Sequence, residues 1–256
     1  MNNSNVCIFI LSTRAERYNC FIKAIENSWY KVAIDYGFKV FFYSGGYSEN
    51  CIYSHNEIRV IENDSITNTY RKFVSAKNVL LDKFPEIQLV FRTNLSSYID
   101  VENFSRYISK CFFKKDSYHG VLGKANLLSE FFYGNKLFHL GFKYLHFGPK
   151  INFFSGAGFF IGVDLCNILS LDDSKKYLID DVEIGRQIKE FSRHDYKYQR
   201  IYITDSYCKI RKDELDSLVN DSMLFHYKFK TINRYDDAEN IFKFSDIEFR
   251  NNFLTI

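Results

Sequence analysis

Phe153-Phe-Ser-Gly-Ala-Gly-Phe-Phe-Ile-Gly162 is the first of two stretches that decide how this chain is interpreted. The second, which follows a short helical segment, is Ile179-Asp-Asp-Val-Glu-Ile-Gly185. The first stretch places small residues between two apolar runs, which predicts a tight turn in which glycine permits positive φ or a close ligand approach. The second places a pair of carboxylates at the start of a helix. A strand connection followed by a helix with an acidic first turn is therefore expected.

The residues before this unit alternate apolar runs with helical patterns. Val6–Leu11 is a continuous apolar run of strand length, typical of a strand buried on both faces. Apolar residues then recur at helical spacing over 14–36, with Gly37 as the stop, and 38–43 is predicted as the next strand. A loop at Ser44-Gly-Gly46 follows. The opening is therefore predicted to be β-α-β.

The same alternation continues along the chain. Further strands are predicted at 57–61, 87–91 and 199–204, helices at 65–84 and 101–112, an aromatic loop or hairpin at 123–150, an apolar and basic segment at 223–230, and a C-terminal helix at 236–256. This order predicts an α/β fold with a central sheet flanked by helices. Ligand sites of such folds lie beyond the carboxyl ends of the strands.

Bulk properties narrow the class of protein. With 256 residues, 46% of them hydrophobic, and no linker-like segment, one domain over 1–256 is expected. A net charge of +3 gives no reason to expect a nucleic-acid partner. Six widely spaced cysteines predict reduced thiols, and the N-terminus lacks the features of a signal peptide, so a cytoplasmic protein is expected.

The carboxylate pair has a structural and a chemical interpretation. Asp180 and Glu183 fit a D-x-x-E capping box, which by itself accounts for Asp180. Asp181 is not needed for that cap, and at a helix start it can project into a cleft and accept a proton from a hydroxyl. Capping and complementing the helix dipole is the usual role of such a pair. Both interpretations stay open at this point.

Two other candidate sites are weaker. His226 lies in an apolar run ahead of Lys228 and Lys230, where it can contact a metal or a diphosphate, although a lone histidine in such a run is more often a core residue. No paired-histidine spacing predicts a metal site. The glycines of 155–158 lack the strand-to-helix context of a dinucleotide-binding loop, which excludes that interpretation.

The order of these motifs resembles the inverting GT-A glycosyltransferases of the β1,3-galactosyltransferase, N-acetylglucosaminyltransferase and Fringe class. The resemblance implies a GT-A-like, Rossmann-related α/β fold with a mixed central sheet flanked by helices. The stretch 153–162 resembles that family's Y-C-S-G-G-G-Y-V-L-S, and 180–185 resembles E-D-V-Y-V-G. Ala24–Trp29 looks like A-I-R-x-T-W, Asp64–Lys72 is similar to D-x-Y-x-N-L-x-x-K, and His226 falls where the family has its late histidine. The resemblance covers about residues 20 to 230.

One departure concerns the metal. Where the family has K-T-D-D-D-V-F-V, this chain has Arg92-Thr-Asn-Leu-Ser-Ser-Tyr-Ile99, so every carboxylate of the DxD motif is replaced. The family uses Mn²⁺ or Mg²⁺. Asn94 and Ser96 are poor ligands for these hard cations, which favour anionic oxygen ligands. Either Arg92, Lys228 or Lys230 offsets the diphosphate charge without metal, or catalysis is lost. The candidate base at Asp181 favours the first.

The resemblance implies an inverting transferase that moves a sugar from a nucleotide diphosphate sugar, with UDP favoured, to a hydroxyl of a glycan or lipid-linked saccharide in surface-polysaccharide synthesis. Residues 1–100 would form the donor half and 101–256 the acceptor and base half. The residues implied are, for the donor, Thr13, Arg14, Arg92, Thr93, Asn94, Ser96, His226 and Lys228; for the acceptor, Ser155, Gly156, Ala157, Gly158 and Asp180; and as base, Asp181.

The alternative is a non-catalytic carbohydrate- or nucleotide-binding protein that keeps the fold without the DxD motif. A metal-dependent nucleotidyltransferase or nuclease is less favoured because paired carboxylates at neighbouring strand ends are missing. Lys228, Phe229, Lys230 and Arg234 are expected either to touch a membrane surface peripherally or to form a solvated face.

Overall fold

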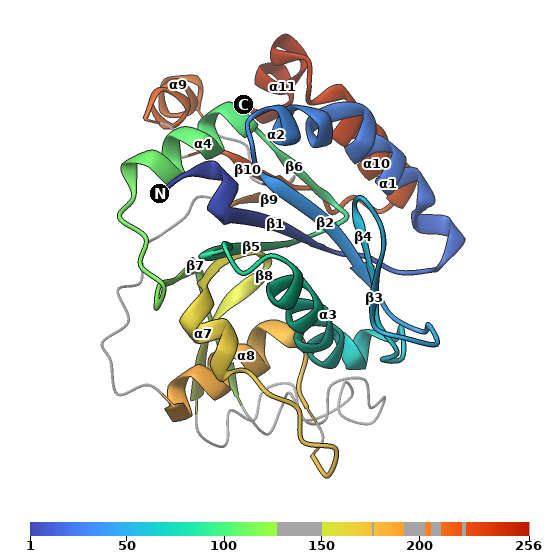
Figure 1. Cartoon of the computed structure of the whole chain (residues 1–256). Coiled ribbons are helices and arrows are strands. Elements are labelled where there is room, and N and C mark those ends of the chain that lie inside the picture. The colour runs from blue at the N-terminus through green and yellow to red at the C-terminus, as the bar shows by residue number, and fades with distance from the viewer. Residues whose placement is uncertain (127–149, 176, 192–202, 206–210, 222–223, 256) are drawn as a thin grey trace.

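A computed structural model describes residues 1–126, 150–175, 177–191, 203–205, 211–221 and 224–255. They contain a seven-stranded sheet in the order β3-β4-β2-β1-β5-β8-β7 and a three-stranded sheet in the order β6-β10-β9 (Figure 1). The strands are β1 (Val6–Leu11), β2 (Lys39–Ser44), β3 (Cys51–Ser54), β4 (Glu57–Arg59), β5 (Leu89–Asn94), β6 (Ser97–Ile99), β7 (Tyr118–Asn126), β8 (Lys150–Gly162), β9 (Ile203–Asp205) and β10 (His226–Lys228).

Helices lie between and after these strands. They are α1 (Asn19–Ile25), α2 (Lys31–Asp35), α3 (Thr69–Lys83), α4 (Val101–Lys110), α7 (Val163–Ile168), α8 (Asp180–Phe191), α9 (Lys212–Asn220), α10 (Arg234–Lys243) and α11 (Ile247–Leu254). Short 3-10 turns are η1 (Asn3–Asn5), η2 (Glu16–Tyr18) and η4 (Ile66–Asn68), and η3 (Glu26–Tyr30) is a π-helical turn that joins α1 to α2.

The large sheet is mixed. β1 pairs in parallel with β2 and β5, and β2 in parallel with β4, whereas β8 runs antiparallel to both β5 and β7. β1 is central, and its residues Val6–Ile10 are fully buried, as their continuous apolar run requires. The expected α/β fold with a mixed central sheet flanked by helices is confirmed. The carboxyl ends of β1, β2, β4 and β5 meet at one edge.

Helices cover both faces of the sheet and enclose two apolar cores. In Figure 1, α1, α2, α4, α9, α10 and α11 lie on one face, and α3, α7 and α8 on the other. On the first face, Phe91, Phe104 and Phe160 pack with ring centroids 4.6–5.7 Å apart. On the second, Phe9 stacks on Tyr43 at 4.2 Å. These aromatic cores use the high Phe and Tyr content of the chain.

The predicted turn at 155–158 is wrong. β8 runs unbroken through these residues as a bulge, because Phe154 pairs with Leu122 and Phe159 with Gly120, so that four residues oppose one. Neither glycine of the bulge has a positive φ. Small residues are needed here by close packing instead: a Cβ on Gly158 would lie 2.9 Å from the rings of Phe91 and His226.

Other boundaries differ from the prediction in smaller ways. The first helical segment starts at Glu16, contains the π-helical turn η3, and ends before Gly37, whose φ is 86°. β5 continues to Asn94, so Arg92–Asn94 belong to the strand. The C-terminal segment forms two helices, α10 and α11. Most of the aromatic segment 123–150 and most of the strand expected at 199–204 lie outside the described residues.

Candidate active site

A pocket of about 660 Å³ opens at the carboxyl ends of β1 and β5. Its walls come from the segment after β1, from η4 and the start of α3, from the turn between β5 and β6, and from the segment after β10. The described lining residues are Leu11, Ser12, Thr13, Ala15, Arg17, Tyr18, Asp64, Ile66, Thr69, Lys72, Asn94, Leu95, Ser96, Lys228, Lys230 and Arg234. This is the position that the topology of an open α/β sheet favours for a ligand.

The pocket is strongly cationic. Among its described lining residues, Arg17, Lys72, Lys228, Lys230 and Arg234 carry positive charge, and the single carboxylate is Asp64. Arg234 pairs with Asp237, and Lys72 pairs with Asp64 at 2.8 Å. By formal charge, the described lining side chains carry five positive groups and one negative group, which suits an anionic ligand such as a phosphate or diphosphate.

Asp64 organises the floor of this pocket. Its Oδ2 accepts the Thr13 hydroxyl and the Arg14 backbone N–H, both at 2.7 Å, and its Oδ1 accepts Lys72 Nζ at 2.8 Å. The backbone N–H of Gly45 donates to Oδ1 at 3.4 Å. Although burial raises the pKa of the Asp64 carboxyl, these hydrogen bonds and the Lys72 charge hold it below its usual range. Asp64 is therefore ionised and rigidly placed.

The turn between β5 and β6 falls where the family that the sequence resembles has its DxD motif. The Asn94 side-chain carbonyl accepts the Ser96 N–H at 3.2 Å and the Ser96 hydroxyl at 2.9 Å, so the turn closes on itself. The Trp29 indole N–H donates to the Ser97 carbonyl at 3.2 Å and fixes the turn to the first helical segment. Within the described ranges no group of three His, Cys, Asp or Glu side chains could hold a metal ion.

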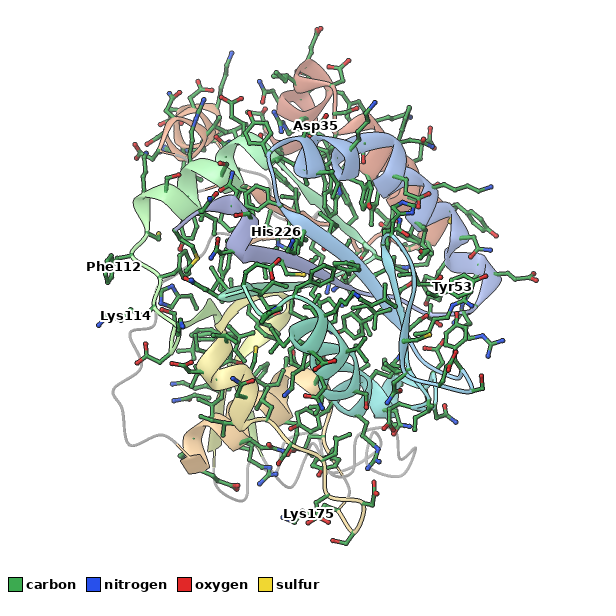
Figure 2. The ribbon with its side chains drawn as sticks, viewed as in Figure 1. Asp35, Tyr53, Phe112, Lys114, Lys175 and His226 are labelled. Carbon is green, nitrogen blue, oxygen red and sulfur yellow. The ribbon has the colours of Figure 1, made fainter. Side chains whose placement is uncertain are left out.

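His226 lies in the core beside the pocket. Its side chain is 0% exposed, and Figure 2 shows it in the interior of the molecule. Nε2 shares a 2.9 Å hydrogen bond with the hydroxyl of Thr93, itself fully buried, and the ring packs against Phe91. Burial, with a smaller effect of Lys228, lowers the pKa of His226 to about 3. The ring is therefore neutral and packed, as in the core-histidine interpretation.

Arg92 and Asp180 form a buried ion pair at the start of α8. The Arg92 guanidinium, which is 2% exposed, pairs through Nη2 with Asp180 and donates through Nη1 to the Gly156 carbonyl. The predicted capping box is wrong, because the Glu183 N–H donates to the Ile179 carbonyl. The Asp180 carboxylate is engaged by the guanidinium, so it has another role than the cap that its spacing predicted.

Asp181 is half-buried beside this ion pair. Its Oδ2 accepts the Gly156 N–H at 2.7 Å and its Oδ1 accepts the Val182 N–H at 2.9 Å. Burial first, and the neighbouring charge of Asp180 second, raise the pKa of Asp181 to about 6. Opposing this, the Gly156 hydrogen bond and the charge of Arg92 lower it. A carboxylate with this pKa is a competent proton acceptor near neutral pH.

Three hydrogen bonds connect the Asp180–Asp181 pair to the wall of the cationic pocket. The Asn94 side-chain amide, which lines the pocket, donates to the Gly156 carbonyl at 3.1 Å, and the Gly156 N–H binds Asp181. On the other side, the Thr69 hydroxyl lines the pocket and accepts the Asp180 N–H at 3.1 Å. Asp181 is thus next to the pocket, although its own side chain is not part of the lining.

A second pocket of about 310 Å³ adjoins the first and shares Ser12 and Thr13 with it. Arg14 lies in its wall, where the guanidinium sits 4.8 Å from the centre of the Tyr47 ring and donates to the Gly46 carbonyl. This pocket is polar, and it extends the cationic pocket past the end of β1.

The structure divides the residues expected at the donor and acceptor sites. Thr13, Asn94, Ser96 and Lys228 line the cationic pocket, and Arg14 lines its neighbour. The buried residues that reach neither pocket are Arg92, Thr93 and His226. Of the bulge residues expected for the acceptor, Gly156 lies beside Asp181 and Arg92, and Gly158 lies against Phe91 and His226. None of the four, Ser155, Gly156, Ala157 and Gly158, lines either pocket.

Several lining residues were not expected, among them Ser12, Arg17, Thr69, Lys72 and Arg234. A signal existed for Lys72, because eight residues separate it from Asp64 across the start of a predicted helix, and the first turn of α3 brings the two together. No local pattern distinguishes Arg17 or Arg234 from other surface cations.

The proposed membrane-facing residues are also divided. Phe229 is 1% exposed and packs against Phe244 at 4.6 Å, so it is a core residue. Lys228, Lys230 and Arg234 face the cationic pocket. None of the helices in the described part of the chain is long and apolar enough to cross a membrane. The described cysteines are free thiols.

Of the comparisons with known proteins, only the one with solved structures gives a match. No protein-family model matches the sequence, and no curated protein matches it. Among solved structures, the chain is similar to the crystal structure of a glycosyltransferase involved in the glycosylation of the major capsid of PBCV-1, at 11% sequence identity and a TM-score of 0.48. The match covers 92% of this chain and 98% of that chain.

Proposed function

We propose that the protein is an inverting glycosyltransferase that binds a nucleotide diphosphate sugar in the cationic pocket, without a metal ion, and uses Asp181 as general base. The observation that carries the proposal is a pocket lined by cationic side chains next to the Asp181 carboxylate, whose pKa is raised to about 6. UDP is the favoured nucleotide, and the acceptor is a hydroxyl of a glycan or a lipid-linked saccharide.

The cationic lining supports a metal-independent donor site. In metal-dependent transferases a divalent cation neutralises the departing diphosphate. Here Lys228 and Lys230 line the pocket on one side and Arg17 on another, so ammonium and guanidinium groups can provide the same neutralisation through charge-assisted hydrogen bonds. Asn94 and Ser96 are poor cation ligands.

These positions support an inverting displacement. The Asp181 carboxylate takes the proton of the acceptor hydroxyl, whose oxygen forms a bond to the anomeric carbon of the donor sugar. The bond from that carbon to the diphosphate breaks, and the electron pair leaves with the diphosphate, which the pocket cations stabilise. Attack from the side opposite the leaving group inverts the configuration of the anomeric carbon.

Nucleotide release tests the reaction. We would incubate the protein with UDP-, GDP-, TDP- and CMP-sugars and a mixture of glycan acceptors, with EDTA or with manganese. The proposal expects release of one nucleotide at the same rate in EDTA. Release that requires manganese would contradict metal independence.

Asp181→Asn tests the base. The amide keeps the shape of the side chain but cannot accept the proton, so we expect transfer to fall by a factor of about 10² to 10⁴ while nucleotide binding is retained. Asp213→Asn, at an exposed aspartate in the first turn of α9, is the matched control and should be fully active. Full activity of Asp181→Asn would overturn the assignment.

The competing function is a carbohydrate- or nucleotide-binding protein. The observation that favours it is the absence of carboxylates from the β5–β6 turn among the described residues. Saturable nucleotide binding with no nucleotide release on any sugar of the panel would support it.

A further inference from the structure

We propose that Arg92 is the positioning residue of the candidate base: its guanidinium ties the first turn of α8 to the bulge of β8 and so holds Asp181 in its working position. The inference rests on the proposed function, since it assigns Asp181 as base. The proposal gives a role to Arg92, which the sequence predicted to contact the diphosphate and which the structure buries outside the pocket.

The connection runs through a single residue of the bulge. Arg92 Nη1 donates to the Gly156 carbonyl, and the N–H of the same Gly156 donates to Asp181 Oδ2 at 2.7 Å. Nη2 of the same guanidinium pairs with Asp180, the residue before the base. The planar guanidinium therefore restrains Asp181 in two ways, through Gly156 of the bulge and through Asp180 in the same helix as Asp181. A guanidinium can do this because it presents several N–H donors in a fixed plane.

Gly156 separates the two side chains by little more than its own backbone. A Cβ at this position would lie 3.1 Å from Arg92 Nη1 and 3.1 Å from Asp181 Oδ2. The bulge thus brings a glycine, and no larger residue, between the guanidinium and the carboxylate. This explains why small residues occupy the bulge although none of its glycines has a positive φ.

The guanidinium is enclosed on every described side. Tyr43 from β2 faces it, and the Phe159 ring centre from β8 lies 5.9 Å from its central carbon. Burial raises the pKa of Tyr43, so this phenol is neutral. Although burial lowers the pKa of Arg92, the charge of Asp180 raises it above its ordinary value. Arg92 is therefore a permanent cation. Because the side chain is buried, it does not contact a ligand in the pocket.

Arg92 and Asp180 act on Asp181 in opposite directions. Among the described residues, the charged groups that face Asp181 are Asp180 from α8, which raises its pKa, and Arg92 from β5, which lowers it. α3 contributes the neutral hydroxyl of Thr69, bound to the Asp180 N–H, and β8 contributes backbone groups. If Arg92 only stabilised the fold, removing its charge would not change the pKa of Asp181.

The experiment follows the titration of the Asp181 carboxyl by ¹³C NMR, with the signal assigned by its loss in Asp181→Asn. Asp180→Asn removes the like charge, so we expect the midpoint to move to lower pH. Adding Arg92→Met to Asp180→Asn removes the remaining positive charge, so the midpoint should move up by about 1 pH unit relative to Asp180→Asn alone. The double variant removes both partners of the buried Arg92–Asp180 ion pair, which favours folding compared with the removal of one partner alone.

Arg92→Lys separates charge from geometry. Lysine keeps the positive charge but cannot contact Asp180 and the Gly156 carbonyl as a planar fork. We expect kcat to fall by about 10-fold or more, with little change in KM for the donor, because the base is misplaced while the pocket is intact.

Arg250→Met is the matched control. Arg250, in α11, pairs at 2.6 Å with Asp100, which precedes α4, and both side chains are nearly buried. α4 and α11 lie on the opposite face of the sheet from α8 (Figure 1). Breaking that pair should destabilise the protein without moving the Asp181 titration. An equal movement in Arg250→Met, or no movement between the single and double variants, would overturn the positioning role.

The two proposals fail separately. If the titration shifts as expected but the wild-type protein releases no nucleotide, the transferase function fails and the restraint of Asp181 by Arg92 stands. If the protein transfers sugar but neither shift is seen, the function stands and the role of Arg92 is rejected.

Discussion

Ionising Asp181 costs the folded protein stability. The pKa of this carboxyl is about 6 in the folded state against 3.8 in the unfolded chain, so the folded state holds the proton more tightly. Stability from this group is complete below about pH 4 and is lost as the pH rises through about 6. A base kept near the pocket in this state trades stability for reactivity.

Asp181→Asn should therefore stabilise the protein above pH 7. The amide cannot ionise, so we expect the free energy of unfolding to rise by about 1–2 kcal/mol at pH 8 and to change little at pH 4, after allowance for the partial exposure of the side chain. Urea unfolding at the two pH values measures this. A stability change of the same size at both would contradict it.

Asp64 has the opposite linkage. Its pKa lies below the usual range in the folded state, so its contribution is present above about pH 4 and is lost as the pH falls through the folded value. Asp64→Asn leaves Lys72, whose side chain is 3% exposed, without its carboxylate, so we expect a loss of about 2–4 kcal/mol at pH 7. Denaturant unfolding should show a smaller loss at pH 3. Equal loss at both would rule out a charge effect.

Among the elements, α8 and β8 together set the position of the base. Gly185 in α8 lets the helix approach β8, since a Cβ there would lie 2.6 Å from the Asn152 carbonyl oxygen and 2.7 Å from Phe153 Cβ. The approach brings the first turn of the helix to the bulge. Any change that lifts α8 off the strand should move Asp181 away from Gly156.

Gly185→Ala tests this packing. We expect a loss of about 1–3 kcal/mol of stability, from overpacking, and a fall in transfer rate larger than in Lys189→Ala, at an exposed position of the same helix. Thermal unfolding and the nucleotide-release assay measure the two effects. Activity equal to that of the control would mean that the separation of α8 and β8 does not position the base.

At the scale of the whole molecule, the pocket joins four segments that are distant in sequence, so a bound nucleotide should hold them together. A nucleoside diphosphate in EDTA should raise the free energy of unfolding, by about 2.7 kcal/mol at 100 times its Kd. The matching nucleoside, which lacks phosphate, should stabilise far less. Because pocket cations hold the phosphates, the effect should weaken as salt rises from about 0.05 M to 0.5 M. A salt-independent effect would contradict this mode of binding.

Most strands and helices of the first 110 residues were predictable, because each long apolar run and each helical period is a local pattern, whereas the short strands β3 and β6 were not predicted. The bulge of β8 was not, since a strand bulge and a turn use the same small residues; only the pairing of Phe154 and Phe159 with β7 distinguishes them. The prediction that Asp180 caps the helix was wrong for a similar reason. Its spacing fits a capping box, but a buried guanidinium from another strand engages the carboxylate.

By itself the sequence determined the α/β class, the central buried strand β1 and the helix start that carries Asp181, because short-range periodicity and burial are written along the chain. Only the tertiary structure decided which charges meet. It buried Arg92 and His226, turned Lys228 and Lys230 to the pocket with Lys72, and placed Gly156 between a guanidinium and a carboxylate. These contacts join residues far apart in the chain, and no local pattern encodes the distance between them.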